Sequence, residues 1–161
     1  MYDKILVPLD GSPLSENSLK HVANLVVGCR ASQVVVLRVV EQPPLLLIEF
    51  GSQGQDNEIY KNRQKELQQT REAAEKYLAK VSEKLKTQGI NVQSAMVEAE
   101  QGQSAAEVIM KYAENNNIDL IVMSTHGRSG ITRWAFGSVT DKVVRHSRVP
   151  VLSIAPEGAR V

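Results

Sequence analysis

Short apolar segments alternate with helix-type segments along the whole chain, and this alternation constrains the fold more than any other sequence feature. Apolar and partly β-branched runs predict strands at residues 4–9, 33–40, 90–99, 119–124 and 149–155. Helix-start residues and helical spacing predict helices after Ser12, over 59–88, after Ser104 and over 137–147. A chain of this order is expected to form an α/β fold, a parallel sheet with right-handed crossovers and helices on both faces.

The expected helix ends rest on capping residues. Ser104 and Glu107 have the spacing of a capping box, in which each side chain bonds a backbone N–H at the other position. Ser12 is expected to cap the first helix, with Pro13 in its first helical position. Gly28 and Gly89 are expected to end the first and second helices. The apolar stripe expected on the longest helix consists of Leu67, Ala74, Leu78, Val81 and Leu85.

Length and composition limit the class of protein. The 161 residues suit a single domain over 1–161, because no internal repeat interrupts the pattern. Nineteen basic and 18 acidic residues leave a net charge of +1, which gives no reason to expect nucleic acid or a membrane surface as partner. The first apolar run is too short for a signal peptide, and no run approaches the ~20 residues of a membrane helix, so we expect a cytoplasmic protein.

Cys29 is the only cysteine in the chain. A single cysteine excludes an internal disulfide and a metal site built from several thiolates. We expect Cys29 to be a small buried residue at a helix end.

A glycine-rich stretch, "STHGRSGITRWAFGSVTDK", follows the strand predicted at 119–124. Gly127 and Gly130 can let backbone N–H groups approach phosphate oxygens, and Arg128 can supply positive charge. The next four residues open the last predicted helix, whose N–H groups and dipole attract anions: Gly137, Ser138, Val139 and Thr140. The alternative is structural, with glycines that only make turns and a Ser138 that caps its helix.

The ends of two other strands lie beside this stretch in a parallel sheet. Asp10 follows Pro8 and Leu9 at the end of the first strand, where it could accept a hydrogen bond from a ribose hydroxyl or hold a hydrated Mg²⁺. Its alternative role is to stabilise a turn. Met123 ends the fourth strand and could line a base or ribose, although a methionine there is more often a core residue.

Three segments together resemble the universal stress protein family. They are "KILVPLDGS" at the start, "VVVLRVVE" after the first helix and "MSTHGRSGITRWAFGSVTDKVVRHSRVPVLSI" at the end. The family's nucleotide-binding pattern is G-x-x-G, nine residues, then G-[ST]. In this chain Gly127, nine residues and Gly137-Ser138 match that pattern, and Ser124 stands at the position of its first glycine.

The resemblance implies a Rossmann-like fold of the adenine nucleotide alpha hydrolase type, with a five-stranded parallel sheet of order 3-2-1-4-5. It also implies a homodimer formed through the last strand, 149–155, and ATP as ligand, together with Mg²⁺ or Mn²⁺. Val39 matches the family position whose backbone meets the adenine edge. Serine at position 124 is tolerated if its backbone has strand geometry and is strained if it needs a positive φ.

The nucleotide-contacting residues expected on all these grounds are Pro8, Leu9, Asp10, Val39, Met123, Ser124, Gly127, Arg128, Gly130, Gly137, Ser138, Val139 and Thr140. Asp10 is also the expected metal contact, through Mg-ATP. His126 is not paired with a nucleophile and a carboxylate in any known pattern, so we predict no catalytic residue and at most slow ATP hydrolysis.

Two functions stay open at this point. The first is an ATP-binding stress or signalling module. The second is a homodimeric interaction protein that shares the fold and binds no nucleotide. The apolar segment "LLLIEF" at 45–50, in a predicted loop, could serve as a contact for a protein partner under either function.

Overall fold

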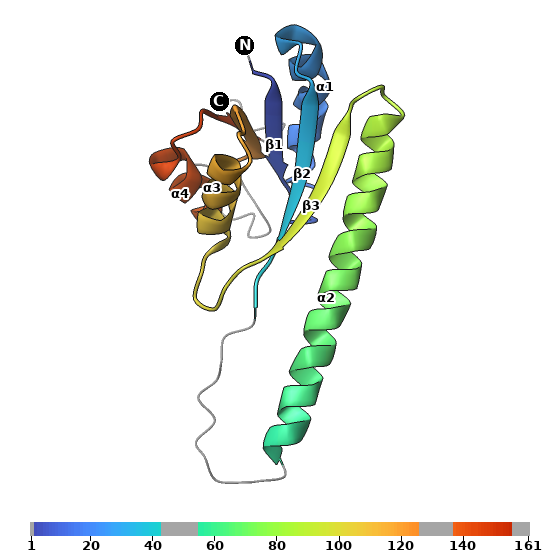
Figure 1. The fold of residues 1–161 in the computed structure, drawn as a ribbon, viewed down its shortest axis with the longest axis vertical. Helices are drawn as coiled ribbons and strands as arrows, with labels where there is room; N and C mark the ends of the chain where they lie inside the picture. Colours follow the sequence, from blue (N-terminus) through green and yellow to red (C-terminus); the bar gives the residue numbers. More distant parts are fainter. Residues whose placement is uncertain (1, 43–54, 126–136, 156–161) are drawn as a thin grey trace.

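The protein is described by a computed structural model over residues 2–42, 55–125 and 137–155, with the side chains of 55–57 not described. Figure 1 shows a central twisted sheet with helices packed on both of its faces. The strands are β1 (Lys4–Pro8), β2 (Gln33–Val40), β3 (Val92–Glu98), β4 (Leu120–Ser124) and β5 (Val151–Ile154). The helices are α1 (Asn17–Cys29), α2 (Gln55–Lys86), α3 (Ala105–Asn115) and α4 (Ser138–His146).

All five strands are parallel, in the order β3-β2-β1-β4-β5. The predicted fold class, the five-stranded parallel sheet and its 3-2-1-4-5 order are therefore confirmed. The chain adds strands on one side of β1 until β3 and then crosses to the other side at β4. The topological switch point thus lies between β1 and β4, where ligands of open parallel sheets bind.

The two faces of the sheet bury separate apolar clusters because successive residues of a strand point to opposite faces. Ile5 and Val7 of β1 pack toward α1 and α2, with Leu78 of α2 in the same cluster. Leu6 of β1 packs toward α3 and α4, with Ile109 of α3 in that cluster. Burial on both faces explains why the strands read as nearly continuous apolar runs in the sequence.

The first helix begins and ends later than predicted. Ser12 does accept a capping hydrogen bond, from the Ser15 N–H at 3.1 Å, but it caps a turn that precedes the regular helix. The helix continues through Gly28 to Cys29, and its C-cap residue, Arg30, takes the left-handed conformation with φ 56°. Cys29 is half-buried, so the prediction of a buried residue is wrong, although its position at the end of the helix is confirmed.

The second helix extends well past the sheet. Figure 1 shows that its first half projects beyond the carboxyl ends of the strands, and its second half covers the sheet. The predicted stripe is buried at Ala74, Leu78, Val81 and Leu85 but only half-buried at Leu67. The helix runs from Gln55 to Lys86, whereas the sequence predicted 59–88, and Gly89 lies at φ 78° in the turn that follows it. No helix in the described ranges combines the length and the apolar character that membrane spanning requires.

Candidate functional site

A cavity of about 470 Å³ opens at the carboxyl ends of the strands, over the switch point. Its walls come from the ends of β1, β2 and β4 and from the N-termini of α3 and α4. It brings together every predicted site residue that lies in the described part of the chain: Pro8, Leu9, Asp10, Val39, Met123, Ser124, Gly137, Ser138, Val139 and Thr140. Gly127, Arg128, Gly130 and the apolar segment 45–50 lie outside the described residues.

The N-terminus of α4 is fixed against the end of β4. The Gly137 N–H donates to the Thr125 carbonyl at 2.7 Å, and the Thr140 hydroxyl donates to the Ser124 carbonyl at 2.8 Å. Gly137 is the N-cap residue, and no described side chain caps this helix. Ser138 therefore does not have the capping role that was the structural alternative. A helix N-terminus left open in this way presents backbone N–H groups and a positive dipole end to the cavity.

Ser124 has the backbone of an ordinary strand residue. It is the last residue of β4, pairs with Ile154 of β5 and is not among the residues with positive φ. Its hydroxyl donates to the Ser15 carbonyl at 3.4 Å, and the residue is buried, with 7% of its surface exposed. The serine is therefore accommodated without backbone strain, which answers the question that the sequence left open.

Asp10 stabilises the turn after β1. Its Oδ1 accepts the Ser12 N–H at 2.8 Å, and Gly11 between them has φ 81°. This is the turn role considered from the sequence, and it holds the carboxylate at the cavity wall. Contact of Asp10 with a ribose or a metal stays a prediction. Within the described residues no group of three or more His, Cys, Asp or Glu side chains could hold a metal ion.

Val39 presents its backbone to the cavity side of the sheet. Along β2 the Leu37 carbonyl accepts the Leu9 N–H, and the Val40 carbonyl accepts the Ala99 N–H of the β3 side, both at about 2.8–2.9 Å. Backbone direction alternates along a parallel strand, so the Val39 N–H and C=O point the same way as those of Leu37. The register of β1 with β2 ends at Leu37, so the Val39 groups lie beyond it and face the cavity.

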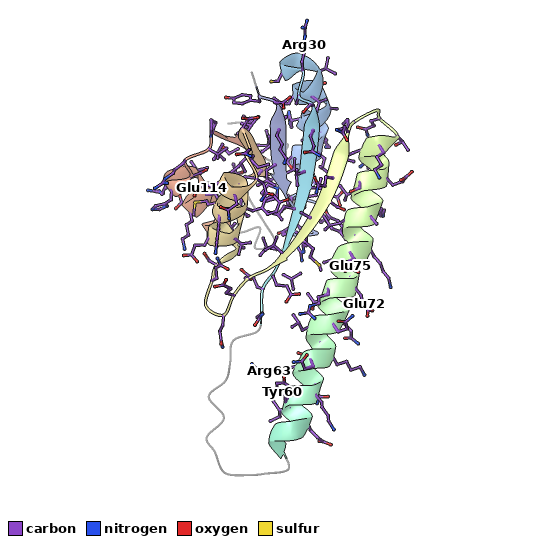
Figure 2. The ribbon with its side chains drawn as sticks, viewed as in Figure 1. Arg30, Tyr60, Arg63, Glu72, Glu75 and Glu114 are labelled. Carbon is purple, nitrogen blue, oxygen red and sulfur yellow. The ribbon has the colours of Figure 1, made fainter. Side chains whose placement is uncertain are left out.

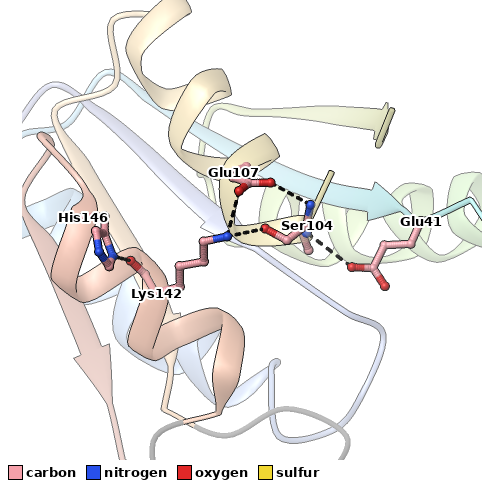
Figure 3. A network of polar contacts seen from close by, with 6 residues as sticks. Glu41, Ser104, Glu107, Lys142 and His146 are labelled. Carbon is pink, nitrogen blue, oxygen red and sulfur yellow. Dashed lines mark hydrogen bonds and ion pairs between the residues drawn. The ribbon is translucent and has the colours of Figure 1, made fainter. Parts of the chain in front are cut away.

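Side chains of α3 and α4 form a polar network beside the cavity (Figure 3). Lys142 of α4 donates to Glu107 Oε1 at 2.8 Å and to Ser104 Oγ at 3.0 Å. Glu107 also accepts the Ser104 N–H at 2.9 Å, as the predicted capping box requires. The hydrogen bond from Lys142, followed by that from the Ser104 N–H, lowers the pKa of Glu107 to about 2. The network holds the two helix N-termini side by side.

Several cavity residues were not predicted from the sequence. They are Ser15, Leu37, Arg38, Val40, Glu41, Thr70, Ala105 and Ile109. Glu41 could have been found, because it directly follows the strand predicted at 33–40 and so stands at the carboxyl end of the sheet. Thr70 could not, because nothing local shows that the middle of α2 reaches this edge of the sheet.

A second cavity, of about 650 Å³, lies on the α2 side and shares Arg38 and Thr70 with the first. The Arg38 guanidinium donates to the Leu9 carbonyl at 3.3 Å, between the two cavities. Tyr77 lines the second cavity, and burial, with the nearby Glu16 carboxylate as a further cause, raises its pKa. Although this cavity is larger, it contains none of the predicted contacts, so the first cavity is the better candidate for the functional site.

Known proteins with similar sequences and known structures with a similar fold belong to one family. The model of the universal stress protein family matches residues 1–154. Universal stress protein MJ0531 of Methanocaldococcus jannaschii is 32% identical, covering 96% of this chain and 82% of its own. MJ0577 of the same organism is 30% identical, covering 96% and 95%. The solved structure of MJ0577 superposes with a TM-score of 0.80 at 26% identity, over 98% of this chain and 99% of that one.

Two more distant solved structures share the fold and hold a nucleotide. One is a universal stress protein in complex with cAMP, with TM-score 0.62 and 18% identity over 96% of this chain and 97% of that one. The other is an Arabidopsis thaliana family member with AMP bound, with TM-score 0.62 and 15% identity over 98% and 97%. Given the family match over nearly the whole chain and the shared fold, this protein belongs to the universal stress protein family.

Proposed function

We propose that this protein binds ATP in the cavity over the switch point and acts as a stress or signalling module. The observation that carries the proposal is the open N-terminus of α4. The first-turn residues Ser138, Val139 and Thr140 line the cavity, and no described side chain caps this end of the helix. Phosphate oxygens are the ligands that such a helix end favours.

The other walls suit the rest of an adenine nucleotide. Met123 and Ile109 offer apolar contacts for a flat ring, and the Val39 backbone offers a donor and an acceptor for its edge. Asp10 provides a carboxylate for the ribose hydroxyls or for the hydrated Mg²⁺ or Mn²⁺ that accompanies the triphosphate. The cAMP- and AMP-bound proteins support this assignment, since their shared fold accommodates adenine nucleotides.

Binding is tested by thermal denaturation of the purified protein with Mg-ATP. At a ligand concentration 100 times the dissociation constant, the folded state gains about 2.7 kcal/mol, and Tm rises accordingly. A Tm that does not move up to millimolar Mg-ATP contradicts the proposal. Chromatography of the supernatant from denatured native protein adds an independent measurement, because a resident ATP is released with it.

The role of the α4 N-terminus is tested by Gly137→Asp. The N-cap backbone, at φ −57° and ψ 145°, is one that aspartate adopts readily, and aspartate is a favoured cap, so the fold is retained. The carboxylate competes with the phosphates, and we expect ATP affinity to fall at least about tenfold. Gly137→Asn is the matched control of equal size without charge, and an equal loss in both variants contradicts the electrostatic role.

We further propose that the site holds the nucleotide more than it transforms it. His21 and His146 lie outside the cavity. The described charged groups of the cavity wall are the carboxylates of Asp10 and Glu41 and the guanidinium of Arg38. Without a positioned nucleophile, this set supports slow hydrolysis at most. ATP turnover by the wild type and by Asp10→Ala tests this. Turnover above about 1 s⁻¹ that is lost in the variant would show an ATPase with Asp10 in its machinery.

Finally, we propose a homodimer formed through β5. This strand ends the sheet, and Leu152 on it and Val144 on α4 are 36% and 44% exposed. An edge strand with exposed apolar side chains is a surface that natural proteins cover.

A further inference from the structure

Two carboxylates cap the N-terminus of α3, so the two helix ends at the cavity differ in charge. Glu41 Oε1 accepts the Ala105 N–H at 3.3 Å, and Glu107 accepts the Ser104 N–H at 2.9 Å (Figure 3). A phosphate group placed at this helix end would meet the Glu41 carboxylate, which lines the cavity, whereas Glu107 is paired with Lys142 outside the cavity lining. The N-terminus of α4, with no described side-chain cap, is the only one of the two cavity helix ends in the described chain that is open to an anion. The phosphates of a bound nucleotide therefore lie at α4, and its base points toward the end of β2.

Glu41 stands at this base end. It directly follows Val40, the last residue of β2, and its carboxylate reaches the N-terminus of α3, the helix against which Leu37 and Val39 pack. Glu41 and Val39 both line the cavity, and Glu41 is exposed, so a ligand can reach the carboxylate. The hydrogen bond to Ala105 restrains the side chain in this place. A negatively charged hydrogen-bond acceptor thus lines the same cavity as Val39, at the end of β2.

We propose that the Glu41 carboxylate selects the nucleobase by accepting a hydrogen bond from an exocyclic amine at the purine 6-position. An ionised carboxylate only accepts hydrogen bonds. Adenine carries an amine at that position and satisfies the carboxylate, whereas guanine carries a carbonyl oxygen and opposes one acceptor to another. The site therefore takes 6-aminopurine nucleotides in preference to 6-oxopurine nucleotides. This inference rests on the proposed nucleotide binding and names the residue that sets its specificity.

The test compares dissociation constants of Mg-ATP and Mg-GTP by titration calorimetry, in the wild type and in Glu41→Gln. A charge-assisted hydrogen bond with a penalty against the wrong base predicts that the wild type binds ATP at least about tenfold more tightly. The glutamine amide can accept from adenine or donate to guanine, so the preference for ATP over GTP should fall at least about threefold in the variant, and the Val39 backbone accounts for any preference that remains. An unchanged ratio in Glu41→Gln overturns the inference.

Glu107→Gln is the matched control. It removes the other carboxylate at the α3 N-terminus, one that does not line the cavity. The inference requires that this variant keep the wild-type preference for ATP. An equal loss of preference in both variants would show that the carboxylates act through the position of α3, and it overturns the assignment of a base contact to Glu41.

A second measurement needs no variant and tests whether the 6-amino group is contacted at all. Purine riboside triphosphate lacks the 6-amino group but is otherwise ATP, and the wild type should bind it about tenfold more weakly. Equal affinity for the two ligands overturns the inference. Binding of ATP and GTP with equal strength also overturns it while leaving the proposed function intact, whereas failure to bind any of the three nucleotides contradicts both.

Discussion

At the scale of single residues, position 124 connects the sequence pattern to the site. Serine there departs from the glycine of the family pattern, yet the residue has strand geometry and ends a paired strand. Its carbonyl accepts the Thr140 hydroxyl at 2.8 Å, which anchors the first turn of α4. That bond uses only the backbone of Ser124, so it does not depend on the side chain.

Substitution Ser124→Gly should therefore leave ATP affinity unchanged within about twofold, because no strained φ is relieved. The variant loses only the 3.4 Å contact between the hydroxyl and the Ser15 carbonyl. Glycine in a strand costs about 0.5–1 kcal/mol of unfolding free energy. Urea denaturation measures this cost, and calorimetric titration with Mg-ATP measures the affinity. A gain of tenfold or more in affinity would show that the serine obstructs the ligand.

Strand-end residues of the site could be predicted because one rule covers them. Asp10 follows an apolar run and Met123 lies at the end of one, and the carboxyl ends of parallel strands meet at one edge. Val39 was instead assigned from the resemblance to the family. Arg38 could not be assigned in this way, because it extends to the opposite face and reaches the Leu9 carbonyl only in the folded sheet. A residue that follows an easily recognised strand can be assigned to the site from the sequence. A residue that reaches the site through a contact with another strand cannot.

At the scale of elements, α2 has two parts with different surroundings. Its second half buries Leu78 at 3% exposure against the sheet. In its first half Ile59 and Tyr60 are 41% and 63% exposed, and Figure 2 shows Tyr60 and Arg63 on the part that projects away from the sheet. The helical period is the same in both halves, but only one half has a sheet to pack against.

Two leucine substitutions on α2 measure this difference. Leu78→Ala removes a fully packed side chain and should lower the free energy of unfolding by about 2–5 kcal/mol. Leu67→Ala, at a half-buried position of the same helix, should cost less than about 1 kcal/mol. Urea denaturation of both variants makes the comparison. Equal losses would mean that the projecting half is packed as firmly as the other.

Helix existence was predictable from the sequence, whereas some helix ends were not. Ser12 and Pro13 are typical helix-start residues, but Asp10 and Ser12 close a turn first and the regular helix begins at Asn17. Gly28 is the residue that propensity selects as a helix end, yet the left-handed cap falls on Arg30. Local propensity indicates which residues can end a helix, and the packing of the next strand decides which one does.

The ion pair between Glu107 of α3 and Lys142 of α4 makes the stability of the fold depend on pH. Lys142 and the Ser104 N–H lower the pKa of Glu107 from 4.5 to about 2 in the folded protein. In the unfolded chain this carboxyl titrates near its usual value, so between these pH values the unfolded state binds more protons. The stabilisation is therefore complete above about pH 5 and is lost progressively as the pH falls toward 2.

Urea midpoints measured from pH 6 to pH 2.5 follow this loss, and the comparison with Glu107→Gln isolates its origin. The variant cannot ionise at this position, so its stability should fall less steeply with acid over the same range. Parallel curves for the two proteins would show that Glu107 does not contribute to the pH dependence. Lys142→Met is a second control, because it removes the cation and should likewise flatten the curve.

At the scale of the whole molecule, the strand order exposes two edges with different surroundings. The β3 edge is held to α2 by the ion pair between Arg71 and Glu98, with atoms 2.6 Å and 2.7 Å apart. The β5 edge is short and carries Leu152, with Val144 of the neighbouring helix also exposed. The two edges differ in apolar surface, and this difference places the proposed homodimer at β5.

A charge placed on each edge in turn tests that assignment. Leu152→Lys puts an ammonium group on the proposed interface, where its burial in a dimer is unfavourable, so the protein should become monomeric by light scattering at micromolar concentration. Ser94→Lys places the same charge on an exposed position of β3 and should leave the dimer intact. A wild type that is monomeric, or a Leu152→Lys variant that stays dimeric, contradicts assembly through β5.

The monomeric variant also tests whether one chain forms the whole cavity. The described cavity wall comes from a single chain, at the carboxyl ends of its strands, so ATP affinity should be unchanged in this variant.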